Sequence, residues 1–163
     1  MRHHPDRRFL FSHPAHFIAF GAGAGLMRKA PGTWGTLVAL PVFAFAQVGG
    51  TAGVLAAAAL CFIAGIWASG IAAEALGVAD HGGIVIDEIA AFLLVLAFTP
   101  AAAGWWLIAF LLFRLFDILK PWPISVADRS IKGGFGVMFD DVLAAGYAIA
   151  AIQLLRPLLQ SLI

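Results

Sequence analysis

The stretch FRLFDILKPWPISVADRSIKGGFGVMFDDV, residues 113–142, decides how this chain is organised. It concentrates charges of both signs, prolines and glycines in a chain that is otherwise mostly apolar. Four of the ten basic residues and four of the nine acids lie here: Arg114, Lys120, Arg129, Lys132, Asp117, Asp128, Asp140 and Asp141. A polar segment between long apolar runs is either a solvated loop or a site where cations meet an anionic ligand.

The composition of the rest of the chain is far from that of a soluble domain. Hydrophobic residues make up 62% of the 163 positions and charged residues 12%, against roughly 45–50% and about 25% in ordinary globular domains. The mean hydropathy is +0.96, so the expected solvent is a lipid bilayer. We therefore expect a single domain over residues 1–163, an all-α, polytopic helical membrane protein.

The ends and the lone cysteine exclude several other classes. Residues 1–12 contain Arg2, Arg7 and Arg8 and predict either a basic arm against an anionic leaflet or a solubilising tail. FSHPAHF interrupts any early apolar run, so no secretory signal is expected. Cys61 stands alone, which leaves no intrachain disulfide or thiolate metal cage. We expect no nucleic-acid partner, and the oligomeric state stays open.

Apolar runs predict two helical hairpins and a C-terminal helix. The first hairpin joins residues 37–47 and 54–76, and its first helix can borrow a lower turn from the PGTWGT segment. The second joins the apolar runs 89–98 and 101–113 through a turn at 99–104, although a single kinked span over 89–113 is the alternative. Residues 54–76, at about 1.5 Å each, exceed the roughly 30 Å hydrocarbon core. The last helix is expected over 142–155.

The distribution of Lys and Arg predicts the orientation. Nine of the ten basic residues lie in the N-terminal arm, at Arg28-Lys29 and within 114–132, whereas the turns at 47–53 and 99–104 have none. Cationic loops favour the cytoplasmic side. We expect the polar loops to gather there, with the C-terminus outside.

A glycine-rich segment, FGAGAGLMRKAPGTWGT at 20–36, precedes the first hairpin. Pro31-Gly32-Thr33 predicts a turn that leads into a helix, with Thr33 or Thr36 as its N-cap. Free amides at such a terminus suit a phosphate group. A flexible turn at the membrane boundary is the other interpretation.

Carboxylates recur near the predicted helix ends. Asp87 and Glu88 open the third helix, Asp117 lies near the end of the fourth, and Asp140-Asp141 open the fifth. Acids near membrane depth are costly unless they are paired or metal-bound, and a site rich in oxygen suits Mg²⁺ or Mn²⁺ rather than Zn²⁺. Structural interpretations remain open: Asp140 as a helix cap, and i,i+3 ion pairs of Asp117 with Arg114 or Lys120.

The chain resembles the phosphatidylglycerophosphatase A family in ordered blocks between residues 21 and 141: G-A-G-A-G-L, A-P-G-T-W-G-T, D-H-G-G-I-V-I-D-E, F-R-L-F-D-I-L-K-P-W-P-I and K-G-G-F-G-V-M-F-D-D. Met27-Arg28 departs from the Ser-Pro expected after Gly25-Leu26. The resemblance implies a Mg²⁺-dependent integral membrane phosphatase of the bacterial inner membrane. Such an enzyme converts phosphatidylglycerophosphate to phosphatidylglycerol, and its active site is expected to face the cytoplasm.

This function assigns roles to the polar residues. The expected metal ligands are Asp87, Glu88, Asp117, Asp140 and Asp141. The expected substrate-binding residues are Thr33, Thr36, Arg114, Lys120, Arg129 and Lys132. Catalytic roles are expected for Asp80, His81, Asp87 and Asp141. Water is the preferred nucleophile, with Asp80 or Asp141 as base, although a phospho-aspartate route stays open. For His81, a structural loop histidine is the favoured alternative to a catalytic base.

Two other functions fit the composition. A cation-coupled transporter normally places ionisable groups near the bilayer midplane, whereas the centres of these apolar runs are free of charge. A metal-dependent lipid-headgroup transferase uses similar chemistry, but the D-G-x-x-A-R pattern of CDP-linked lipid transferases is absent from the sequence.

Overall fold

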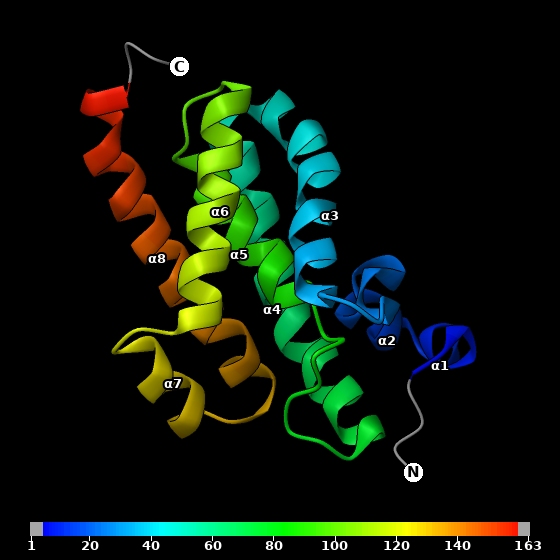
Figure 1. Ribbon diagram of the computed structural model, residues 1–163. Helices are drawn as coiled ribbons and strands as arrows, with labels where there is room; N and C mark the ends of the chain where they lie inside the picture. The colour runs from blue at the N-terminus through cyan, green and yellow to red at the C-terminus, as the bar shows by residue number, and fades with distance from the viewer. Residues whose placement is uncertain (1–4, 160–163) are drawn as a thin grey trace.

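The computed structural model describes residues 5–159, and this part of the chain consists of helices and loops without a β-strand (Figure 1). The all-α prediction is therefore confirmed for the described residues. The elements are α1 (Arg7–Ser12), α2 (Pro14–Ala19), the 3₁₀ segment η1 (Gly21–Leu26), α3 (Pro31–Ala46), the 3₁₀ turn η2 (Gln47–Gly49), α4 (Gly50–Leu76), α5 (Ile86–Ala97), α6 (Ala103–Leu119), α7 (Ile124–Ser130) and α8 (Gly133–Leu159).

Both predicted hairpins form. η2 joins α3 to α4, and residues 98–102 join α5 to α6. α3 begins at Pro31, so the first apolar run does extend into the PGTWGT segment. The two tight turns and the end of α8 lie at the upper end of Figure 1, whereas the loop at 77–85, α7 and its flanking turns lie at the lower end. The polar segments therefore share one end of the bundle.

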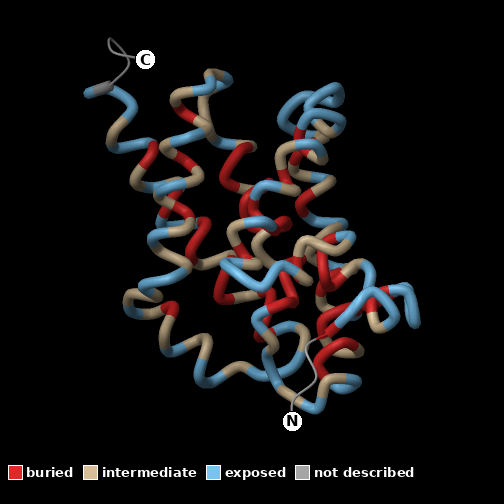
Figure 2. Tube along the Cα trace, turned by 45° about the vertical axis from the view of Figure 1, so that its right-hand side comes forward, coloured by how far each residue is buried: buried red, intermediate tan, exposed pale blue. Residues whose placement is uncertain are grey.

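Helix α5 forms the centre of this bundle. It packs against α3, α4, α6 and α8, and most of its residues are buried, as the red interior of Figure 2 shows. Its 12 residues span only about 18 Å, less than the roughly 30 Å of a hydrocarbon core. α5 is thus too short to cross such a core by itself, and its four neighbouring helices enclose it. Its first turn, which carries Asp87 and Glu88, lies nearest the polar end of the bundle.

The outer face of the bundle is apolar. On α6, Leu107, Leu111, Leu115 and Ile118 recur at helical spacing and are between 47% and 69% exposed. Two helical stretches are long and apolar enough to cross a membrane, residues 31–76 and 133–158, with mean hydropathies of 2.2 and 1.6. Exposed apolar stripes of this kind mark contact with lipid or with another protein. They are consistent with membrane association.

The last helix differs from the prediction. α8 begins at Gly133 rather than Val142, because glycines allow it to press against α4. A Cβ at Gly134 would lie 1.9 Å from the Ile66 carbonyl oxygen, so packing overrides the poor helix propensity of glycine. Asp140 and Asp141 consequently lie about two turns inside α8. The prediction that they open the helix is wrong, and the alternative interpretation of Asp140 as its N-cap is excluded.

The N-terminal segment is folded from Arg7 onward. Asp6 caps α1 by accepting a hydrogen bond from the Phe9 amide at 2.9 Å. Arg7 and Arg8 are exposed on α1, whereas Arg2 and the rest of residues 1–4 lie outside the described residues. The described part of the basic arm is therefore a short helix beside the bundle (Figure 1).

A carboxylate-rich candidate active site

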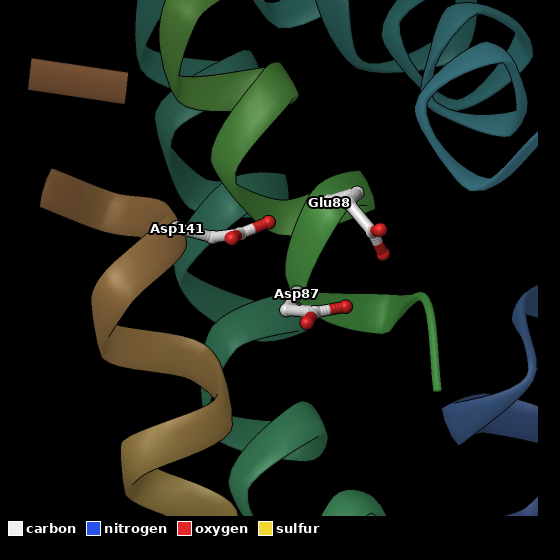
Figure 3. A group of neighbouring side chains, drawn as sticks. All are labelled: Asp87, Glu88 and Asp141. Atoms are coloured by element: carbon white, nitrogen blue, oxygen red, sulfur yellow. The ribbon is translucent and has the colours of Figure 1, made fainter. Parts of the chain in front are cut away.

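Three carboxylates from two helices meet at the polar end. Asp87 and Glu88 lie in the first turn of α5, as the sequence predicts, and Asp141 extends toward them from α8 (Figure 3). One oxygen from each side chain lies within 4.8 Å of the others. The packing of α5 against α8 therefore joins acids that are more than fifty positions apart in the sequence.

These carboxylates carry oxygens that no neighbouring group satisfies. Asp87 Oδ1, Glu88 Oε2 and Asp141 Oδ2 are buried and have no hydrogen-bond partner among the described residues. A buried carboxylate oxygen needs a donor or a cation to offset its lost hydration. Opposite ligands of Mg²⁺ lie about 4 Å apart, so a small contraction of the cluster would suit this ion. The donor set thus fits a hard divalent cation.

Arg114 pairs with two acids, Glu88 of this cluster and Asp117. Its Nη1 atom is 3.4 Å from Glu88 Oε1 and 2.5 Å from Asp117 Oδ2. The predicted i,i+3 pair of Arg114 with Asp117 is therefore confirmed. Because both partners are largely buried, Arg114 can fix the orientation of Glu88 and Asp117.

Lys120 connects two further acids. Its Nζ atom donates to Asp128 Oδ1 at 2.6 Å and to Asp140 Oδ2 at 2.5 Å, so it pairs with these acids rather than with Asp117. Lys120 ends α6 in the left-handed backbone region, with φ of +42°. A residue other than glycine rarely adopts this conformation, which is found mainly in turns and at functional sites.

The lysine pair also shifts acidity. Burial lowers the pKa of Lys120, but its hydrogen bonds and attraction to Asp128 and Asp140 outweigh that effect and raise it above the ordinary value. The hydrogen bond from Lys120 lowers the pKa of Asp128. Both groups are therefore charged over a wide pH range around neutrality.

These groups line a polar cavity of about 130 Å³, which has room for several water molecules. Its ionisable lining residues are Asp80, Asp87, Glu88, Asp117, Lys120, Asp128, Lys132, Asp140 and Asp141. All five predicted metal ligands are among them, together with two predicted phosphate-binding lysines and Asp80. The structure thus brings most of the predicted site residues into one cavity.

Five predicted site residues do not line the cavity: Thr33, Thr36, His81, Arg114 and Arg129. Thr36 is buried, and its hydroxyl donates to the Gly32 carbonyl at 2.8 Å. The N-cap of α3 is Ala30, without a side-chain cap bond, so the prediction that Thr33 or Thr36 caps this helix is wrong. The His81 ring accepts a hydrogen bond from the Gly83 amide at 3.0 Å, and Arg129 is exposed on α7.

The glycine-rich segment at 20–36 packs closely against Glu88, Arg114 and the loop at Gly83. A Cβ at Gly32 would lie 2.0 Å from Glu88 Oε1 and 3.0 Å from the Arg114 guanidinium nitrogens. A Cβ at Gly25 would lie 1.9 Å from the Gly83 carbonyl oxygen. These glycines let α3 and η1 support the loop that carries Asp80 and the start of α5.

Sequence reasoning missed two participants. The sequence pattern predicts no role for Asp128, which in the structure pairs with Lys120 and lines the cavity. The turn between α6 and α7 separates the two residues, so no helix-spacing rule predicts their contact. The sequence predicts a turn at Gly32, whereas the structure places this glycine against Glu88, 56 positions further along the chain.

The fold and the cavity define the class: an all-helical protein with an apolar outer face, whose carboxylates and lysines gather at one end. The chain belongs to the phosphatidylglycerophosphatase A family, whose model matches residues 17–156. The predicted family resemblance is confirmed, and the chain is an enzyme of a phosphatase family.

Individual relatives agree with this assignment. A Haemophilus influenzae protein named phosphatidylglycerophosphatase A is 42% identical over 151 residues, which cover 91% of this chain and 92% of the relative. The Escherichia coli protein of the same name is 36% identical over 138 residues, with coverages of 84% and 80%. A Bacteroides thetaiotaomicron protein, provisionally named a phosphatidylinositol-3-phosphatase, is 36% identical over 147 residues, with coverages of 85% and 91%. No solved structure matches the chain.

Proposed function

We propose that this protein is a Mg²⁺-dependent membrane phosphatase that hydrolyses the terminal phosphomonoester of phosphatidylglycerophosphate, giving phosphatidylglycerol and phosphate. The family membership supports the reaction and the substrate. The observation that carries the proposal is the convergence of Asp87, Glu88 and Asp141, with unsatisfied oxygens, beside two lysines at one end of an apolar bundle.

The same proposal assigns a membrane arrangement. The hairpins α3–α4 and α5–α6 and the helix α8 lie in the bacterial inner membrane, with α5 enclosed by its neighbours. The polar end faces the cytoplasm, because the Lys and Arg residues concentrate there while the turns at 47–49 and 98–102 have none. A lipid phosphate at the headgroup level can then reach the cavity.

Asp87, Glu88 and Asp141 would hold Mg²⁺, with Asp117 and Asp140 at the edge of the same cavity. The bound ion would polarise the phosphoryl group and lower the pKa of a water molecule. Asp87, Glu88 and Asp141 have buried oxygens in this cavity, and reduced contact with water strengthens the interaction of such charges with a cation.

The remaining residues bind phosphate and move protons. Lys120 and Lys132 line the cavity and can neutralise phosphate oxygens that do not react. Asp80 lies at the exposed rim of the cavity, where it can accept the proton of the attacking water; Asp141 is the alternative base. Arg114 is a positioning residue, since it pairs with Glu88 and Asp117 and does not line the cavity.

In the reaction, the water oxygen attacks phosphorus and the bond from phosphorus to the glycerol oxygen breaks. The glycerol oxygen takes up a proton and leaves as the hydroxyl of phosphatidylglycerol. Charge stabilisation and in-line positioning supply most of the acceleration in phosphoryl transfer.

The test is phosphate release from phosphatidylglycerophosphate by purified protein in lipid–detergent micelles. We expect EDTA to abolish turnover and Mg²⁺ to restore it, and we expect Asp87→Asn and Asp117→Asn to remove it in a folded protein. Glu74→Gln, at an exposed acid of α4 outside the cavity, is the matched control. Turnover that persists in EDTA, or wild-type rates in both aspartate variants, would refute the metal assignment.

The name of the Bacteroides relative suggests a second candidate substrate, phosphatidylinositol 3-phosphate, for the same assay. Phosphatidylinositol 3-phosphate also presents a lipid-linked phosphomonoester, so it can use the same cavity chemistry. A higher kcat/KM for this lipid than for phosphatidylglycerophosphate would keep the phosphatase mechanism but reassign the substrate.

A further inference from the structure

An apolar groove lies beside the carboxylate cavity. It has a volume of about 340 Å³, within the usual range of about 300–1,000 Å³ for ligand pockets. Its lining residues come from three helices and are all apolar: Leu55, Ala58, Ala59, Phe62, Ile63, Ala90, Leu94 and Val142. No residue of this groove takes part in the chemistry described above.

Two helices connect the groove directly to the proposed metal ligands. Ala90 and Leu94 follow Asp87 on α5, about 4.5 Å and 10.5 Å further along the helix axis. Val142 immediately follows Asp141 on α8. The groove therefore begins within one helical turn of the carboxylates and continues away from the polar end.

Small side chains create the groove and leave it open to the outside. Ala58 and Ala90 are buried at its floor, with 7% and 3% of their surface exposed. Ala59 and Ile63 are exposed at its edge. A single larger side chain at Ala59 would therefore fill the groove from its open side without entering the core.

We infer that this groove holds one acyl chain of the phospholipid substrate while its phosphate lies in the carboxylate cavity. The inference rests on the proposed lipid phosphatase function. The polarity of the two sites matches an amphiphile: an anion fits the lysines and a bound cation, and a hydrocarbon chain fits the apolar groove. Because Ala90 and Val142 of the groove lie within three residues of Asp87 and Asp141 of the cavity, one lipid that occupies both sites would couple chain binding to phosphate binding. Bulk lipids without a phosphomonoester would not achieve this coupling.

The first experiment compares Ala59→Phe with Ala56→Phe. Ala56 is also exposed on α4 but does not line the groove. Each variant hydrolyses phosphatidylglycerophosphate with long acyl chains and a dihexanoyl analogue, whose short chains reach little of the groove. We expect Ala59→Phe to raise KM for the long-chain lipid at least tenfold, or about 1.4 kcal/mol, with the dihexanoyl kinetics and the control variant unchanged.

Equal effects of Ala59→Phe on both substrates, or kinetics equal to those of the control, would overturn the inference. So would a change in oligomeric state at unchanged KM, because the groove would then be a contact between two copies of the chain. If the wild-type protein releases phosphate from neither lipid, the proposed function fails, and a binding experiment still tests the groove.

That experiment uses phosphatidylglycerophosphate with a photoreactive group on one acyl chain. We expect crosslinks at the groove residues of α4 and α5, and we expect excess unlabelled phosphatidylglycerophosphate, but not phosphatidylcholine, to compete. Crosslinks spread over the outer face of α6, or equal competition by both lipids, would refute a substrate-specific chain site.

Discussion

Asp141→Asn should have opposite effects on stability with and without Mg²⁺. The change keeps the shape of the side chain but removes one charge from the cluster with Asp87 and Glu88. Without a cation, these carboxylates repel one another, so the variant should be more stable than the wild type. With Mg²⁺, the wild type should gain stability that the variant largely lacks, because one of three charged ligands is gone.

The distance between the carboxylates sets the size of the first effect, and the occupancy of the Mg²⁺ site sets the size of the second. Two full charges 4.8 Å apart repel by about 3.5 kcal/mol at an effective dielectric constant of about 20. Screening by water in the cavity reduces this value, so we expect Asp141→Asn to gain about 1–3 kcal/mol in EDTA. For a protein of this size, each 1 kcal/mol corresponds to about 2–4 °C in Tm. At 100 times its Kd, Mg²⁺ would stabilise the wild type by about 2.7 kcal/mol.

Tryptophan fluorescence during thermal unfolding can measure both quantities, since the chain has five Trp residues. The protein is studied in one detergent, with EDTA or with a Mg²⁺ titration, and Glu74→Gln serves as the control for loss of an exposed acid. A variant that is less stable than the wild type in EDTA, or that shows the same Mg²⁺-dependent shift, would refute the reasoning.

Three further predictions concern the surroundings of the cluster. Lys120→Ala should raise KM or lower kcat for the phospholipid, whereas Arg7→Ala should do little; equal effects would exclude a phosphate-binding role for the lysine. The raised pKa of Lys120 and the lowered pKa of Asp128 predict a pair whose contribution to stability is fully present from about pH 4 to pH 10. This contribution is lost as pH falls through the lowered pKa of Asp128 or rises through the raised pKa of Lys120. Asp128→Asn should therefore flatten the acid limb of a curve of stability against pH. An unchanged acid limb would contradict the pairing. Gly32→Ala should cost about 1–3 kcal/mol by overpacking, because its Cβ would meet a glutamate oxygen at 2.0 Å, while Gly49→Ala, with open space around it, should be nearly neutral in a denaturation assay.

The hairpins could be predicted because hydropathy acts locally. Long apolar runs and charge-free turns located the ends of α3 to α6 to within about six residues, and the acids at the start of α5 marked its first turn. The start of α8 was missed because glycine has a low helix propensity. Gly134 instead lets α8 approach the Ile66 carbonyl of α4 closely, a long-range contact that no local pattern reveals.

The site shows the same division. Charge density and the family blocks indicated which residue types matter, and most of those residues do line one cavity. The sequence did not separate the three converging carboxylates from Asp117, which pairs with Arg114, and Asp140, which pairs with Lys120. All five look alike in a one-dimensional pattern.

The sequence by itself determined an all-helical, apolar chain of a phosphatase family whose polar groups gather between helices. Only the tertiary structure decided that Asp141 meets Asp87 and Glu88, that Lys120 bridges Asp128 and Asp140, and that an apolar groove adjoins the cavity. The physical reason is that composition and periodicity act over a few residues, whereas these contacts depend on the register with which α4, α5 and α8 pack. Close approaches at Gly65 and Gly134, which bring together parts of the chain far apart in the sequence, accompany that register.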